Sequence, residues 1–238
     1  MCQKFSLQTP VIVTVVWRML FFLNQEFETL KGCRIAVWDN DNVCPVDESV
    51  SSATLATRKV LEDAGAKVEI AKPKIDSDEL LHCYRECVHD ATLSQQPDQT
   101  ARTYSEFLVT QQRQCKIRDA FANFFSQYDV LLTPTFPVVA FRHDDTPVDY
   151  PFYRDSPRTL PNGLPYYLGC FWPAVANLTL LPATAFPVQG KREESLPVAL
   201  QIVGRELDDF TCLKLVELLE EAGKGTRVAQ FKIPARLR

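Results

Sequence analysis

Two apolar runs near the carboxyl end of the chain constrain its fold more than any other feature. They span Leu180–Val188 and Leu196–Val203, and a short charged turn over Gly190–Glu194 separates them. Each run contains proline, is long enough for a buried strand, and is bounded by residues that suit a hairpin-like connection. The sequence therefore predicts a strand–turn–strand unit here.

A strand–helix–strand unit is predicted nearer the amino end. Leu30–Trp38 has the alternation of a strand, and Asp47 is placed to cap a helix that runs to about Ala64, with Gly65 as its stop signal. Lys67–Ala71 follows as a second short strand. Such a unit indicates an α/β fold whose mixed, mainly parallel sheet is flanked by helices.

The remaining elements follow from apolar periodicity. The run over 129–135 is continuously apolar, which predicts a strand buried on both faces. In the helix over 104–128, Tyr104, Phe107 and Phe121 are expected on one apolar face. The other predicted segments are helices over 78–92, about 168–178 and 208–222, and a long Pro-rich loop over 136–165 that could lie near a ligand site.

Composition excludes some functions. The 238 residues carry a net charge of −4, with 46% hydrophobic and 24% charged residues, which is typical of a globular protein and lacks a basic nucleic-acid footprint. We therefore expect no nucleic-acid partner. The eight cysteines are spread along the chain, a pattern that favours free, largely buried thiols and a cytoplasmic location.

Residues 1–28 form an apolar leader that is separate from the domain predicted over 29–238. Val11–Leu23 is mostly apolar, but Arg18 interrupts it, no cleavage site follows, and it is too short to span a bilayer. A buried or surface helix is the first expectation. A membrane-associated leader and a signal peptide remain open, although a membrane role is disfavoured.

Four segments in order carry a family resemblance. They are LKGCRIAVW with PVDESVSSA, then FANFFSQYDVLLTPTFPVVAF, then RTLPNGLPYY, and finally WPAVANLTLLPAT with LPVALQIVGR. Together they resemble the region that follows the catalytic loop in amidase-signature hydrolases. The resemblance implies the C-terminal half of that fold, C–N bond hydrolysis of a small amide substrate, and no cofactor.

The catalytic part of the family pattern is missing. The family uses a Ser–cis-Ser–Lys triad in a G-G-S-S-G loop, whereas Ser51-Ser52 is the only serine pair here and stands between Val50 and Ala53. Its expected place is the first turns of a helix. Because amide hydrolysis needs an activated nucleophile and oxyanion donors, we assign no catalytic residue and expect the chain alone to be catalytically incompetent.

Other candidate sites are weaker. His82, Cys83, Cys87 and His89 have the residue types of a zinc site, but on one helix they point to two faces, so no metal site is predicted. A Cys–His nucleophile from the same residues lacks an orienting group. Phe171 and Trp172 are the candidate substrate-binding residues. They either line an acyl pocket or anchor a short helix, and the sequence does not decide between these roles.

Several biological roles therefore remain open. The chain is either a truncated amidase or pseudoenzyme, or a non-catalytic binding module that pairs with an intact amidase. An anchor at Val11–Leu23 would instead make it a peripheral membrane protein. In each case half a sheet would leave unpaired strand edges, so a homo- or hetero-oligomer is expected.

Overall fold

A five-stranded sheet organises the chain in the computed structural model, which describes residues 27–92, 102–144, 157–188 and 196–223. The strand order is β2-β1-β3-β5-β4. Its strands are β1 (Arg34–Val37), β2 (Lys67–Ile70), β3 (Val130–Pro134), β4 (Ala183–Val188) and β5 (Val198–Val203). The mixed α/β sheet is confirmed, and its pairings divide evenly: β1 is parallel to β2 and β3, while β5 is antiparallel to β3 and β4.

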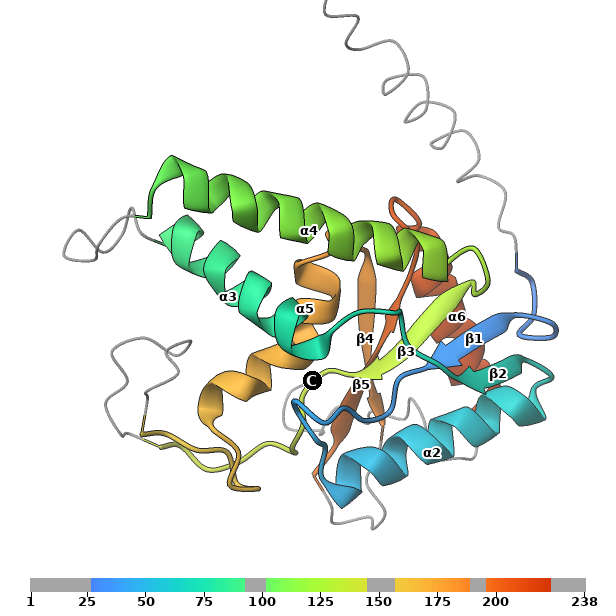
Figure 1. The fold of residues 1–238 in the computed structure, drawn as a ribbon. Coiled ribbons are helices and arrows are strands. Elements are labelled where there is room, and N and C mark those ends of the chain that lie inside the picture. The colour runs from blue at the N-terminus through green and yellow to red at the C-terminus, as the bar shows by residue number, and fades with distance from the viewer. Residues whose placement is uncertain (1–26, 93–101, 145–156, 189–195, 224–238) are drawn as a thin grey trace, which may run out of the picture.

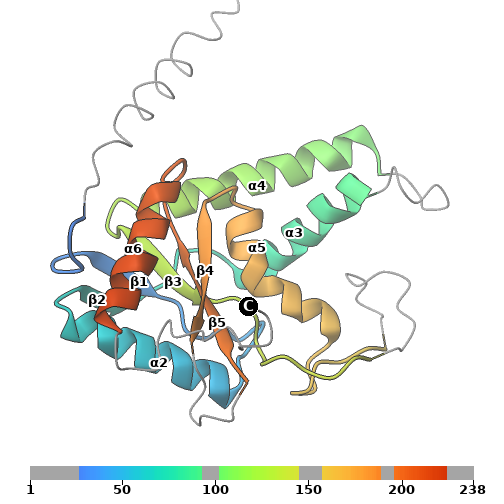
Figure 2. The same ribbon diagram turned by 180° about the vertical axis from the view of Figure 1, so that it is seen from behind.

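Helices cover both faces of the sheet (Figures 1 and 2). One face carries α2 (Glu48–Asp63) and α6 (Asp209–Ala222), and the other carries α3 (Ser77–Thr92), α4 (Tyr104–Phe124) and α5 (Phe171–Asn177), with the 3-10 helix η2 (Tyr166–Cys170) leading into α5. Each face buries its own apolar cluster. The molecule is therefore three layers with two cores.

The start of β1, the end of α4 and the apolar face of α4 differ from the predictions. The first strand begins at Arg34 because residues 30–32 form a turn. The helix predicted to reach 128 ends at Phe124. Its expected apolar face is wrong in the first half, because Tyr104 is 75% exposed and Phe107 39%, whereas Phe121 is buried. This part of α4 projects beyond the sheet, so no core covers it (Figure 1).

Helix termini show which polar residues act as caps. Asp47 precedes α2 with extended backbone, but its side chain makes no capping hydrogen bond, which corrects that part of the prediction. Gly65 does stop α2 as predicted, with φ +87°, and the Ala66 amide reaches back to the Leu61 carbonyl. Thr103 and Glu106 form an unpredicted capping box at the start of α4.

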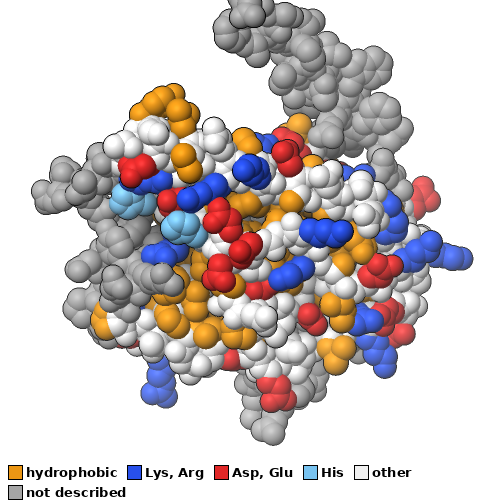
Figure 3. Space-filling model, in the orientation of Figure 1, with side chains coloured by type: hydrophobic (Ala, Val, Ile, Leu, Met, Phe, Trp, Pro, Cys, Tyr) orange, Lys and Arg blue, Asp and Glu red, His pale blue; other side chains and the backbone are white. Residues whose placement is uncertain are grey.

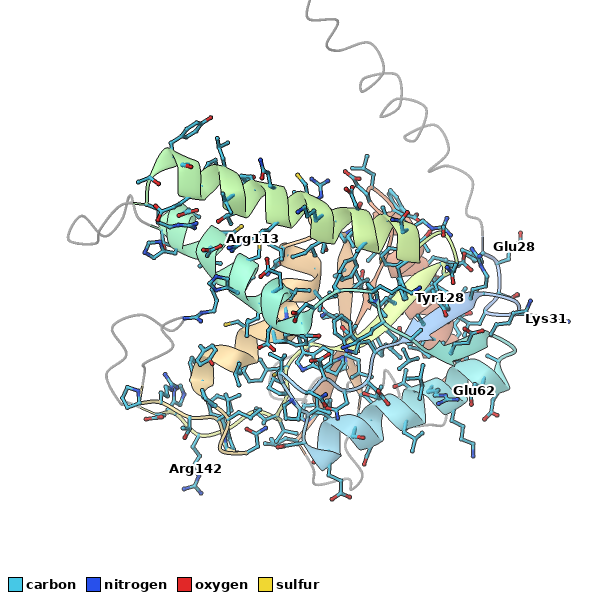
Figure 4. The ribbon with its side chains drawn as sticks, in the orientation of Figure 1. Glu28, Lys31, Glu62, Arg113, Tyr128 and Arg142 are labelled. Atoms are coloured by element: carbon cyan, nitrogen blue, oxygen red, sulfur yellow. The ribbon has the colours of Figure 1, made fainter. Side chains whose placement is uncertain are left out.

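An ion-pair network clamps α3 to α4. The Glu86 carboxylate accepts hydrogen bonds from Arg113 at 2.7 Å and from the Thr110 hydroxyl at 2.9 Å, and it lies 3.3 Å from Arg102. Figure 4 shows Arg113 between the two helices, and Figure 3 shows charged side chains of both signs gathered over them. The opposite charges are paired, so this surface has no strong field of one sign.

An aspartate holds the start of β3. The Asp129 carboxylate accepts hydrogen bonds from the Arg34 side chain (2.7 Å) and backbone amide (2.8 Å) and from Arg205 (2.9 Å). Burial alone would raise the pKa of Asp129, but the hydrogen bonds from Arg34 and the charges of both arginines outweigh it and hold that pKa below its usual value. The carboxylate thus ties the beginnings of β1 and β3 to the end of β5.

We predict that Asp129→Asn destabilises the fold by about 2 kcal/mol at pH 7, because two arginines then face a neutral amide in a partly buried site. A depressed folded-state pKa adds stability above the unfolded pKa of about 3.9, and this is lost as pH falls through the folded value. Urea unfolding at pH 7 and pH 3 measures both effects. The difference in free energy of unfolding between wild type and Asp129→Asn should be smaller at pH 3 than at pH 7. Glu62→Gln, which breaks an exposed pair with Arg58, should cost under about 0.5 kcal/mol.

The described cysteines are unpaired, as predicted. Cys33, Cys44, Cys83 and Cys212 are buried, whereas Cys115 is exposed. Burial, with added repulsion from nearby carboxylates, raises the pKa of Cys33 to about 11 and of Cys44 and Cys212 to about 12. These thiols are therefore unreactive in the folded chain.

Iodoacetamide at neutral pH should label the exposed Cys115 before the buried Cys44. Raising the pKa of Cys44 from 9.0 to about 12 lowers its thiolate fraction about a thousandfold, and burial adds a steric block. Mass spectrometry of peptides labelled with and without urea measures the order. Equal labelling of Cys44 and Cys115 in the folded chain would contradict the burial described here.

Some predicted features lie outside the described residues. These are the leader over Val11–Leu23, the charged turn over Gly190–Glu194, and residues 145–156 of the Pro-rich loop. Within the part of the chain that is described, no helix is both long and apolar enough to cross a membrane.

Candidate functional site at the carboxyl ends of β1 and β3

Ligands of open α/β sheets bind beyond the carboxyl ends of parallel strands, so the ends of β1 and β3 are the place to look for a site. A buried amide organises this region. Gln201 on β5 is 7% exposed, and its Nε2 lies 3.0 Å from Thr133 Oγ1, 3.1 Å from the Trp172 carbonyl oxygen and 3.2 Å from that of Pro134. These contacts fix the start of α5 against the end of β3.

Replacing Gln201 with leucine should cost about 2–3 kcal/mol, because buried acceptors on β3 and α5 lose their donor and no water replaces it. Gln112→Leu is the matched control, since Gln112 is exposed on α4 and its replacement should change stability by less than about 0.5 kcal/mol. Urea denaturation of both variants tests this. If both variants unfolded at the same urea concentration, the contacts of Gln201 would contribute nothing to stability.

The two candidate substrate-binding residues lie in this region. Phe171 and Trp172 begin α5, and neither side chain has exposed surface. Their rings pack edge-on against Trp38, which follows β1, with centroid distances of 5.6 and 5.7 Å. In this structure they anchor α5 to the core. Their role as a pocket wall stays a prediction, because neither ring lines the apolar groove beside β3 or the groove near Arg34 and Arg205.

Trp172 carries an unsatisfied donor. Its Nε1–H is buried and has no well-placed hydrogen-bond acceptor among the described residues. Cys44 interacts with Trp172 closely enough to lower the thiol pKa slightly, against the larger rise caused by burial. A neutral thiol is a weak acceptor, so the indole N–H remains poorly satisfied. Because the Trp172 side chain has no exposed surface, this donor stays within the core.

A serine–lysine contact that sequence reasoning missed lies next to this aromatic cluster. Lys72 Nζ is 3.2 Å from Ser77 Oγ, and Asp41 Oδ2 accepts from both, at 2.6 Å from Lys72 and 2.8 Å from Ser77. The Asp41 side chain is 1% exposed and also accepts from Trp38 Nε1 and the Val43 amide. Asp41 belongs to the run Asp39–Asn42 that follows the first predicted strand, and nothing in the spacing of the three residues predicted their contact.

The geometry of this contact is structural. Lys72 Nζ donates to both Asp41 Oδ2 and Ser77 Oγ, so in this arrangement the amine does not accept the serine proton. The serine hydroxyl itself donates to Asp41 and is buried at the first residue of α3. The cluster thus fastens the segments after β1 and β2 to α3, and its serine is buried rather than presented to a substrate.

An apolar groove opens beside the end of β3. It has a volume of about 260 Å³ and is lined by 135–136, 138–141 and 197–199. Phe136 and Phe141 stack at 6.4 Å on one side. A Cβ built on Gly169 would lie 2.6 Å from the Phe136 ring, so this glycine lets η2 approach the groove closely. The groove can accept a small apolar group.

The histidines and cysteines weighed as a zinc site do not converge. His82 Nε2 lies 3.6 Å from Glu86, whereas the Cys83 thiol points inward to the Thr110 carbonyl. Within the described residues, no group of three His, Cys, Asp or Glu side chains could hold a metal ion.

Comparison with known proteins identifies the family. Residues 85–213, more than half of the chain, match the family model described as Amidase. The chain belongs to the amidase family. Among curated relatives, a glutamyl-tRNA(Gln) amidotransferase subunit from Parvibaculum lavamentivorans is 35% identical over 116 residues, which are 49% of this chain and 21% of the relative. Its counterpart from Thermotoga maritima is 30% identical over 119 residues, 50% and 22% of the two chains.

Solved amidase structures share the fold. The crystal structure of the Thermotoga maritima protein superposes with a TM-score of 0.62 at 25% identity and covers 82% of this chain but 43% of its own. Fatty acid amide hydrolase gives a TM-score of 0.64 at 13% identity and covers 83% and 41%, which supports the fold alone. This amidase chain thus spans less than half the length of these relatives.

Proposed function

We propose that this amidase chain supplies the substrate-side scaffold of a C–N hydrolase acting on a small amide and does not hydrolyse amides by itself. The family membership and the shared fold support the reaction class. The chain matches only 21% of the length of one relative and 43% of that of a solved structure, so the activity of the whole protein is part of the proposal.

The Ser77–Lys72–Asp41 contact carries this proposal. It is the one place where the described residues bring a serine hydroxyl within hydrogen-bond distance of a lysine amine, and Asp41 holds both as donors. An amide carbonyl is a poor electrophile, and a buried serine whose hydroxyl is held between Asp41 and Lys72 is poorly placed to attack it. Nor does the sequence contain the G-G-S-S-G loop that would supply oxyanion donors.

What the chain offers instead is a wall for the substrate. The apolar groove beside Phe136 suits the apolar part of a small amide. The Pro134 and Trp172 carbonyls, which both accept from the buried Gln201 amide, lie at the same end of the sheet and hold α5 against it. In the complete site, Phe171 and Trp172 would lie behind the acyl group and orient it toward a nucleophile carried on another segment.

The purified chain should not cleave 4-nitroacetanilide above the buffer rate, because the serine that the described residues bring to a lysine is buried against Asp41 and the sequence lacks the G-G-S-S-G loop. Release of 4-nitroaniline, followed by absorbance, measures this. A bacterial aryl acylamidase serves as the positive control. Ser77→Ala should leave the background rate unchanged. Turnover that Ser77→Ala or a sulfonyl fluoride abolishes would overturn the proposal.

A second candidate function is a binding module that pairs with an intact amidase. The observation that favours it is β4, an uncharged strand at the edge of the sheet. Two mixing experiments distinguish the binding module from the scaffold. In one, the chain is mixed with a full-length amidase. In the other, it is mixed with only the segment of that amidase that precedes the matched region. Stable co-elution with the full-length enzyme supports the module, whereas gain of 4-nitroacetanilide hydrolysis with the segment alone supports the scaffold.

A further inference from the structure

Two thiols lie next to each other on α3. Cys83 and Cys87 are four residues apart, which places them on the same side of the helix, and their side chains are hydrogen-bonded to each other. Cys83 is fully buried, whereas Cys87 is partly exposed. The pair therefore joins a thiol that solvent does not reach to a neighbour that a small reagent can reach.

The proton of Cys83 decides how the pair behaves. In the neutral pair its S–H donates to the Thr110 carbonyl, with Sγ and the oxygen 3.7 Å apart. Thr110 lies inside α4, where the same carbonyl accepts a backbone amide of its own helix, so it does not depend on the thiol. A thiolate is a stronger acceptor than a carbonyl. The S–H of Cys83 therefore turns to Cys87 once Cys87 has lost its proton.

This donor favours the ionised form of Cys87. The hydrogen bond from Cys83 lowers the pKa of the Cys87 thiol. Burial and the carboxylates of Asp90 and Glu86 oppose this effect, and the charge of Arg102 supports it, so the pKa of Cys87 lies below its usual value. The same hydrogen bond, together with burial, raises the pKa of Cys83. Cys87 is thus the nucleophile of the pair, and Cys83 is its donor.

The described charges near Cys87 are paired. Arg102 lies 3.3 Å from Glu86 and 3.0 Å from Asp90, and Arg113 lies 2.7 Å from Glu86. Figure 3 shows side chains of both signs over α3 and α4. α5, which also packs on α3, carries no charged residue. A reagent that approaches Cys87 therefore meets no strong field of one sign, and it needs no charge of its own.

The helix opposes a covalent bond between the two sulfurs. Residues four apart on a helix have Cβ atoms about 5–6 Å apart, whereas the Cβ atoms of a disulfide lie about 3.5–4.5 Å apart. An internal disulfide would therefore distort α3, which the ion pairs hold against α4. A small group bound to Cys87 through sulfur is accordingly not displaced by Cys83, and it persists.

We propose that Cys87 is a site of thiol–disulfide exchange with small neutral disulfides, and that Cys83 is the donor that activates it. The Cys87 thiolate attacks one sulfur of a disulfide RSSR, a new S–S bond forms to that sulfur, and the original S–S bond breaks. The leaving group RS⁻ keeps the electron pair of the broken bond. It takes up a proton from water, which balances the proton that Cys87 released. One thiol and one disulfide are exchanged for another pair, and no further oxidant is consumed.

Exchange of the full chain with 2-hydroxyethyl disulfide at pH 7 tests the proposal, with mass spectrometry of peptides to locate the adducts. Cys87 should form the mixed disulfide at least about tenfold faster than the buried Cys44. Cys83→Ala should slow the reaction of Cys87 by at least about threefold, because the thiolate loses its donor. Cys83→Ser keeps a donor, so Cys87 should react within about twofold of the wild-type rate.

Cys212→Ala is the matched control. It also removes a buried thiol that bonds to a carbonyl, but on α6, which lies on the other face of the sheet. It should leave the rate at Cys87 unchanged. The rate at Cys44 in each sample reports any loosening of the fold. Because loosening would speed the reactions of Cys44 and Cys87 alike, a slower reaction of Cys87 in Cys83→Ala cannot come from it.

Other results would overturn the proposal. If Cys87 reacted no faster than Cys44, it would not be an exchange site. Equal rates at Cys87 in the wild type and in Cys83→Ala would remove the role of the donor. So would equal slowing by Cys83→Ala and Cys83→Ser, or slowing by Cys212→Ala. A disulfide between Cys83 and Cys87 as the main product would show that α3 does not keep the two sulfurs apart.

Discussion

The fold depends on β3 being buried on both faces. All five of its residues are buried, and strands pair with it on both sides, so neither its side chains nor its backbone meet water. Such a strand can only end where its last polar groups find partners inside the protein. Asp129 with two arginines serves at one end, and the amide of Gln201 serves at the other. The Gln201 contact at the second end also fixes the start of α5.

Sequence periodicity predicted the elements that are determined locally or by burial. The continuous apolar run around Leu131 and Leu132 could only be a central strand, and Gly65 ended α2 because a left-handed residue was needed there. The start of β1 and the exposed half of α4 could not be predicted, because they depend on where the neighbouring layer ends. Tyr104 and Phe107 follow the helical period of a buried face, yet both are exposed and no other element of the described chain covers them.

The candidate site was harder to predict, since its contacts join residues far apart in the chain. Phe171 and Trp172 attracted notice as large aromatics, but their partner Trp38 lies more than a hundred residues earlier. The sequence places Gln201 within an apolar strand and gives no sign that its amide joins β3 to α5. Ser77, Lys72 and Asp41 carry no mutual spacing signal. Their meeting depends on the parallel pairing of β1 and β2, which brings the segments after both strands together.

The buried thiols have a consequence for the lifetime of the molecule. Cys33, Cys44, Cys83 and Cys212 sit at separate points of the two cores, so no native arrangement links them. A chain that loses its fold in air releases four sulfurs that can bond only to wrong neighbours or to other chains. Each unfolding event in air is then irreversible. Without a reductant, the lifetime of the folded protein is therefore set by its unfolding rate rather than by its equilibrium free energy of unfolding.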